Sequence, residues 1–241
     1  MTLYFLILVL GILAGCLSGI VGTGASIILL PILVFAFGAQ QAVPIMAVAA
    51  VMGNIAKMFS WWRSVHWRAF LAYSIPGAIG AALGARTLLI LPPNVAETAL
   101  GLFFIGMIPI HRMLEARGIS IGLFGMALAG GIIGFVSGIV LSTGPISIPV
   151  FAAFGLSQGG LISTEAASSL VIGIGKIVTF HQGGALELPA ILKGVLIGAA
   201  VMVGTLIGRS VLLRMSADRF RLALDAMLLV AGLSMLAAAL T

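Results

Sequence analysis

The sequence contains little charge and almost no cysteine. Twelve Lys and Arg residues and six Asp and Glu residues are all the charge that its 241 residues carry, which is 7%. A soluble domain has about 25% charged residues, so too few charges are present here to build a surface that faces water. Lipid must therefore be the solvent around most of the chain. The single cysteine, Cys16, excludes an intrachain disulfide, an iron–sulfur cluster and a thiolate zinc site.

Motifs of enzyme chemistry are missing as well. His66, His111 and His181 are far apart in the sequence, and no His-Glu-x-x-His zinc motif is present. No phosphate-binding loop with a Gly-Lys-Ser/Thr ending occurs, which argues against ATP hydrolysis. The net charge of +6 is spread over short gaps between apolar runs, so it does not indicate a nucleic-acid partner. We expect a protein that is not an enzyme and that uses neither metal nor cofactor.

One short motif suggests a cleaved lipoprotein signal. Leu13-Ala14-Gly15-Cys16 matches a bacterial lipobox. A signal peptide should open with positively charged residues, yet no residue before Cys16 is charged, and the chain stays apolar through Leu30. We therefore interpret this segment as a membrane helix that contains a cysteine.

Long apolar runs fill the sequence. The longer runs approach the roughly 20 residues that a helix needs to cross a bilayer. Two runs, 24–37 and 145–155, are too short for this, and each follows a long run after a small, polar break that contains glycine. The pattern predicts an all-α integral membrane protein with two broken helices. The runs span residues 3–22, 24–37, 42–60, 69–91, 95–110, 120–141, 145–155, 161–180, 188–208 and 222–240.

Several features recur in the same order in both halves of the chain, which indicates a duplication. We therefore divide the chain into a first repeat, 1–117, and a second repeat, 118–241, which together form one transmembrane domain. The recurring features are Ser18-Gly19-Ile20-Val21 with Ser137-Gly138-Ile139-Val140, Pro31 with Pro149, Lys57 with Lys176, and Gly80-x-x-x-Gly84 with Gly204-x-x-x-Gly208.

The topology follows from the positions of the basic loops. Each repeat holds one broken or re-entrant helix pair and three transmembrane helices, an odd number of crossings. The positive-inside rule places the basic loops 63–68, 111–117 and 209–221 in the cytoplasm, with both termini outside. The halves would then be inverted repeats, as in many secondary transporters. We expect a multi-pass protein of the bacterial inner membrane.

The two breaks are the first candidate for a binding site. A helix that begins within the membrane presents unpaired N–H groups and a positive dipole end, which together suit an anion. Pro145 after Ser142 and Thr143 is typical of a helix start with a capping hydroxyl. The alternative is that the glycines only allow close helix packing. The candidate residues in the breaks are Gly22, Thr23, Gly24, Ala25, Ser26, Ser142, Thr143 and Gly144.

Polar residues inside the later runs are the second candidate. Lys57 and Lys176 are functional candidates because ionisable groups are costly in a membrane, although either could snorkel to the headgroups, which is the reading we prefer for Lys57. Asn54 and Ser168 could face a cavity or hold helices together. Glu165 could carry a coupling proton, but an acid at a helix start, favoured by the dipole, is the reading we prefer.

The two Gly-x-x-x-Gly segments predict close helix crossings, either within the chain or between protomers. Such small-residue faces would suit a homodimer. Beyond a second copy, the partners that we expect are lipid and a small anionic substrate.

The chain resembles the TauE/SafE family of sulfite exporters and related permeases. The residues that carry the resemblance are Gly15-x-x-Ser18-Gly19-x-x-Gly22-x-Gly24-x-x-Ile27-x-x-x-Pro31 and the echo that runs from Gly134-x-x-Ser137-Gly138 to Pro149. The resemblance covers nearly the whole chain. Ala25 and Ser26 stand where members usually have further glycines, so the motif indicates membership better than it indicates substrate.

The resemblance implies export or uptake of sulfite, sulfonates or other small sulfur-containing anions. We therefore expect a secondary transporter with alternating access around a midplane anion site formed by the two breaks, Asn54, Lys57, Ser168 and Lys176. Replacing Gly24 or Gly144 with a bulky residue should then abolish transport. An anion channel and a partner-dependent membrane subunit are the alternatives that the sequence leaves open.

Overall fold

The computed structural model describes residues 8–16, 24–116, 120–141, 143–156, 158–212 and 217–239. Within these ranges every regular element is a helix, which confirms the predicted all-α class. A helix at 8–16 precedes the labelled ones. The others are α2 Gly24–Phe37, α3 Ala39–Trp61, the 3-10 turn η1 Trp62–Ser64, α4 Trp67–Ile90, α5 Pro93–Ala116, α6 Leu123–Val140, α7 Gly144–Ala153, α8 Gln158–Gln182, α9 Leu188–Leu212 and α10 Ala217–Ala239.

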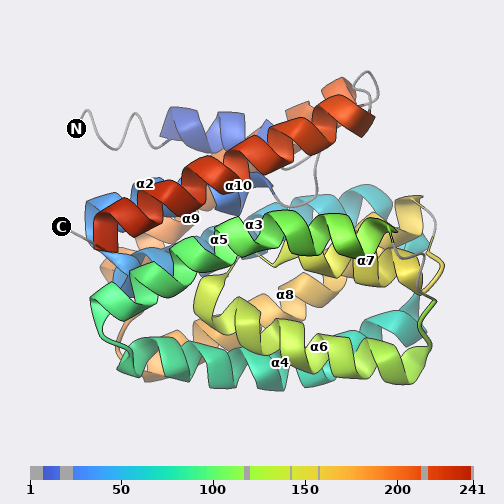
Figure 1. Cartoon of the computed structure of the whole chain (residues 1–241), viewed down its shortest axis with the longest axis horizontal. Coiled ribbons are helices and arrows are strands. Elements are labelled where there is room, and N and C mark those ends of the chain that lie inside the picture. The colour runs from blue at the N-terminus through green and yellow to red at the C-terminus, as the bar shows by residue number, and fades with distance from the viewer. Residues whose placement is uncertain are drawn as a thin grey trace.

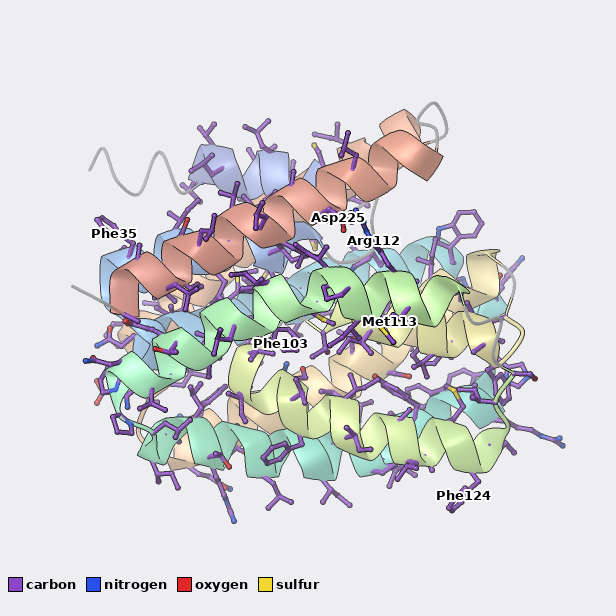
Figure 2. The ribbon with its side chains drawn as sticks, in the orientation of Figure 1. Phe35, Phe103, Arg112, Met113, Phe124 and Asp225 are labelled. Carbon is purple, nitrogen blue, oxygen red and sulfur yellow. The ribbon has the colours of Figure 1, made fainter. Side chains whose placement is uncertain are left out.

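Six of the described helices are long and apolar enough to cross a membrane. They are α3, α4, α5, α6, α8 and α9. Large apolar side chains project outward from the bundle, among them Phe35 and Phe124, which are 89% and 83% exposed (Figure 2). In lipid such side chains are solvated, which is why the protein can leave them outside its core. The multi-pass membrane character that the composition predicts is confirmed.

The breaks produce the two short helices that the sequence predicts. α2 begins at Gly24 and α7 begins at Gly144, directly after α6 has ended. Figure 1 shows α2 toward the left end of the molecule and α7 toward the right end.

Each half packs mainly against the other half. α4 packs on α6 and α8, α9 packs on α3, and α5 packs on α10 (Figure 1). Arg112 on α5 and Asp225 on α10 point toward one another (Figure 2), and the Arg112 Nε–H donates to the Asp225 carboxylate at 3.1 Å. The core therefore lies between the halves rather than within each of them.

Glycines set the closest of these contacts. A Cβ on Gly80 of α4 would collide with the backbone of Gly131 and Phe135 on α6. A Cβ on Gly204 of α9 would collide with the backbone of Ile12 and Cys16 in the same way. Ile12 and Cys16 precede Gly131 and Phe135 by 119 residues, so the same contact occurs twice. Both crossings lie within the chain, and the homodimer predicted from these glycine faces loses that support.

Candidate functional site

A small cavity lies where the two short helices begin. Its volume is about 70 Å³, and its lining comes from α2, α3, α4, α6, α7, α8, α9 and the segment that joins α6 to α7. A polar cavity needs about 10–15 Å³ measured in this way to hold one water molecule. The space is therefore sufficient for several waters or for one small solute.

Both membrane lysines belong to this cavity. Lys57 of α3 and Lys176 of α8 line it and are only 8% and 5% exposed. Snorkelling to the headgroups, the alternative considered for both residues, is therefore wrong. The ammonium of Lys176 donates to Ser137 Oγ at 2.8 Å and to the Ser137 carbonyl at 3.4 Å. That carbonyl lies in the last turn of α6, where a cation also offsets the negative end of the helix dipole.

Glu165 is the acidic member of the lining and is 5% exposed. α8 begins at Gln158, two turns earlier, so the preferred interpretation of Glu165 as an acid at a helix start is wrong. The hydroxyls of Ser169 and Ser147 donate to its Oε1 at 2.9 and 3.2 Å. Lys57 lines the same cavity. The carboxylate is thus held in place from α7 and α8 and shares the cavity with the ammonium of Lys57 on α3.

The start of α7 differs in one respect from the prediction. Pro145 stands in the first turn as expected, but the N-cap residue, Thr143, makes no capping hydrogen bond with its side chain. Pro145 has no N–H, and the Ile146 N–H donates to the Thr143 carbonyl at 3.0 Å. This helix end therefore offers an anion at most the N–H groups of Thr143 and Gly144, fewer than a regular helix start would.

The chain turns at Leu141 between α6 and α7. Leu141 has φ +65°, the one positive φ outside glycine in the described residues, and it lines the cavity. Such a conformation costs a residue with a side chain roughly 1–3 kcal/mol and is found mostly at functional sites. The residue 119 positions earlier is Gly22, for which this conformation is free of strain.

The structure brings together most of the candidate residues. Gly24 is the first residue of α2. Ser168 is fully buried, its Oγ has no hydrogen-bond partner within the described ranges, and it does not line the cavity. Gly22, Thr23 and Ser142 lie outside the described residues. The candidates on the lining are Ala25, Ser26, Asn54, Lys57, Thr143, Gly144 and Lys176.

Other residues that line the cavity were not predicted from the sequence to belong to the site. Ser137 stands in the repeated Ser-Gly-Ile-Val segment, a signal that could have identified it. Tyr73, 2% exposed, lies on α4 and carries no comparable signal. The polar residues missed are Tyr73, Ser137 and Ser147.

The lining residues of α3 and α8 occupy corresponding positions. Four pairs on these helices are separated by 119 residues, the spacing of the repeat, and every member of the pairs lines the cavity. Both helices therefore present the same helical face to one space. The pairs are Ala50 with Ser169, Gly53 with Ile172, Asn54 with Gly173, and Lys57 with Lys176.

The groups that the described residues place in the cavity are two ammonium groups, one carboxylate, one amide and several hydroxyls. Nowhere in the described part of the chain do three His, Cys, Asp or Glu side chains gather as metal ligands would. With Lys57, Lys176 and Glu165 ionised, the lining has a formal charge of +1. Such a site attracts one small anion and can donate hydrogen bonds to its oxygens.

Comparison with known proteins identifies the family of the chain. No curated protein and no solved structure matches the chain. The model of the sulfite exporter TauE/SafE family matches residues 7–235. The chain therefore belongs to the sulfite exporter TauE/SafE family, which is a family of membrane transporters.

Proposed function

We propose that the protein is a secondary transporter of small sulfur-containing anions, such as sulfite or an organosulfonate, and that the cavity is its substrate site. The observation that carries the proposal is the meeting of Lys57 and Lys176 in one buried space. Ionisable residues are rare inside membranes and mark ion and substrate pathways there. Two ammonium groups against one carboxylate favour an anion over a cation, and the hydroxyls of Ser26 and Thr143 suit its oxygens.

Alternating access between inverted repeats would explain how this site reaches both sides. Inverted-repeat transporters bind their substrate near the midplane, at the ends of discontinuous helices. Here α2 and α7 begin at the cavity and lie toward opposite ends of the molecule (Figure 1). The repeated glycine contacts and the corresponding lining positions support the same arrangement. A rocking of one packed group of helices against the other would then expose the cavity first at one end and then at the other.

The orientation in the membrane belongs to the proposal as well. The ends of α3, α5 and α9 and the starts of α4, α6 and α10 lie toward one end of the molecule (Figure 1). These helix ends and the segments that join them carry the basic loops that the positive-inside rule assigns to the cytoplasm. The helix at 8–16 starts at the opposite end, and α10 ends there. We place that end on the outside of a bacterial inner membrane.

Flux into liposomes that contain only this protein tests the proposal. Uptake of labelled sulfite, sulfoacetate, sulfate and chloride should saturate with concentration and should prefer a sulfur oxyanion. Conductance that does not saturate would indicate a channel instead. Absence of flux for every probe, under imposed pH and voltage gradients, would overturn the proposal and favour a subunit that depends on a partner.

A further inference from the structure

Glu165 is the charged residue of the cavity that has no counterpart in the other half. Lys57 and Lys176 correspond at the repeat spacing, whereas the residue 119 positions before Glu165 is Met46. Met46 is fully buried and does not line the cavity. The cations of the site therefore follow the repeat, and the carboxylate departs from it.

The surroundings of Glu165 suit a group that changes its protonation. It accepts hydrogen bonds from Ser169 on its own helix and from Ser147 on α7. A hydroxyl can donate to a carboxylate and can also accept from a carboxylic acid, so these contacts tolerate both forms. Each form would therefore keep its partners inside the protein.

Among the described residues, the other titratable ones on the lining are Lys57 of α3, Tyr73 of α4 and Lys176 of α8, while α7 and the end of α6 present hydroxyls. A tyrosine keeps its proton near neutral pH because its usual pKa is about 10. Loss of a proton from either lysine would remove the attraction for the anion. Glu165 is thus the lining residue whose protonation would strengthen that attraction.

Charge balance then depends on the substrate. With Glu165 ionised, the lining carries a net charge of +1, which one monovalent anion neutralises. With Glu165 protonated, the lining carries +2, which one divalent anion neutralises. An uncompensated charge is costly in a buried space. Both loaded states are therefore neutral only if the divalent anion arrives with a proton.

We propose that Glu165 takes up one proton for each divalent anion that the protein carries, and none for a monovalent anion. The proton passes from water to the carboxylate as the anion binds and returns to water when the anion leaves on the other side. No bond of the substrate changes. This inference rests on the proposed transport function and assigns its coupling.

Proton-driven accumulation in liposomes tests it. The probes are sulfoacetate, which is divalent between pH 6 and 8, and sulfoacetamide, which has nearly the same shape but one charge fewer. Sulfite is unsuitable here because it gains a proton near neutral pH. The membrane potential is held at zero with potassium and valinomycin, and a gradient of one pH unit is imposed. One proton per anion gives about tenfold accumulation of sulfoacetate on the alkaline side of the membrane and none of sulfoacetamide.

The direction of that accumulation follows from the gradient, because the proton moves toward the alkaline side and the divalent anion moves with it. Glu165→Gln mimics the protonated carboxyl, so the variant should carry sulfoacetate without accumulating it. Glu187→Gln makes the same change at an exposed position outside the cavity and should accumulate sulfoacetate like the wild type.

The outcomes separate this inference from the proposed function. Sulfoacetate flux without accumulation in the wild type would overturn the inference and leave the transport function standing. A folded Glu165→Gln variant that carries no sulfoacetate would also overturn it, as would a wild type that carries sulfite but neither sulfate nor sulfoacetate. If the variant does not fold, the comparison of the two probes in the wild type decides. A wild type that carries no anion at all contradicts the transport function itself.

Discussion

α3 and α8 present corresponding faces to the cavity, and comparing them shows which features the two halves share and in which they differ. Both helices supply a lysine at the same position of the repeat. Ala50 on α3 corresponds to Ser169 on α8, and Asn54 corresponds to Gly173. The attraction for an anion is thus present in both halves, whereas the hydroxyl next to Glu165 belongs to the second half alone. The shared lysines of the cavity therefore come from both halves, whereas the carboxylate and its neighbouring hydroxyl come from the second half alone.

The largest expected effect comes from substituting the glycines at the two close helix contacts. Gly80→Leu and Gly204→Leu should each abolish the folded protein, because even a Cβ at these positions would collide with the backbone of the facing helix. Overpacking of a core costs about 1–3 kcal/mol when side chains can yield, and backbone yields less readily. Size-exclusion chromatography in detergent measures the folded yield. Gly106→Leu is the control, because a Cβ there meets nothing within 4 Å. A folded yield of either variant near that of the control would contradict the repeated contact.

The second largest effect is expected from substituting the two lysines of the cavity. Lys57→Met and Lys176→Met should each lower anion transport by about 10–100-fold, because a hydrogen bond to a charged group contributes about 1.5–3 kcal/mol. Lys176→Met should also lower the melting temperature more than Lys57→Met does, since Lys176 binds the last turn of α6. Flux into liposomes and thermal unfolding in detergent measure the two effects.

Lys193→Met is the control for both variants. Lys193 lies over the ring of Phe37, 4.4 Å from its centre, and does not line the cavity. Its loss should change transport by less than about twofold, as is usual for a partly exposed charge. Equal transport by the wild type and by all three lysine variants would show that the cavity is not the substrate site.

Much of the fold could be predicted from the sequence because lipid imposes a simple requirement. A segment that crosses a bilayer must be apolar over about 20 residues and must be helical. The apolar run at 69–91 corresponds to α4, and the run at 188–208 lies within α9. The pairing of the lysines could also be predicted, because the same residue at the same spacing in both halves is a pattern within the sequence.

The rest depends on how the two halves meet. Tyr73 reaches the cavity because α4 packs on α6 and α8, a contact that no local pattern predicts. Glu165 was misjudged because α8 begins earlier than the apolar run suggests, and the polar residues of its first two turns hide that start. Leu141 takes a conformation that usually requires glycine. A leucine at this position therefore gives no indication in the sequence that the chain turns there.

The smallest expected effects come from exchanging a hydroxyl between the halves. Ser169→Ala removes one donor from the Glu165 carboxylate, and a single hydrogen bond contributes about 1 kcal/mol. We expect sulfoacetate transport to fall by about fivefold at a fixed pH. The coupling to protons should persist, because the carboxyl group and its second donor, Ser147, remain. Uptake by the variant with and without a pH gradient measures both quantities.

The reverse exchange, Ala50→Ser, places a hydroxyl at the corresponding position of α3. The first half has Met46 where the second half has Glu165, so no corresponding carboxylate is available to accept a hydrogen bond from this hydroxyl. We therefore expect transport to change by less than about twofold, within the range of a substitution that removes no native interaction. If Ala50→Ser changes transport as much as Ser169→Ala does, the hydroxyls act on the substrate directly rather than through Glu165. The exchange thus decides whether the second half differs from the first by its carboxylate or by its hydroxyl.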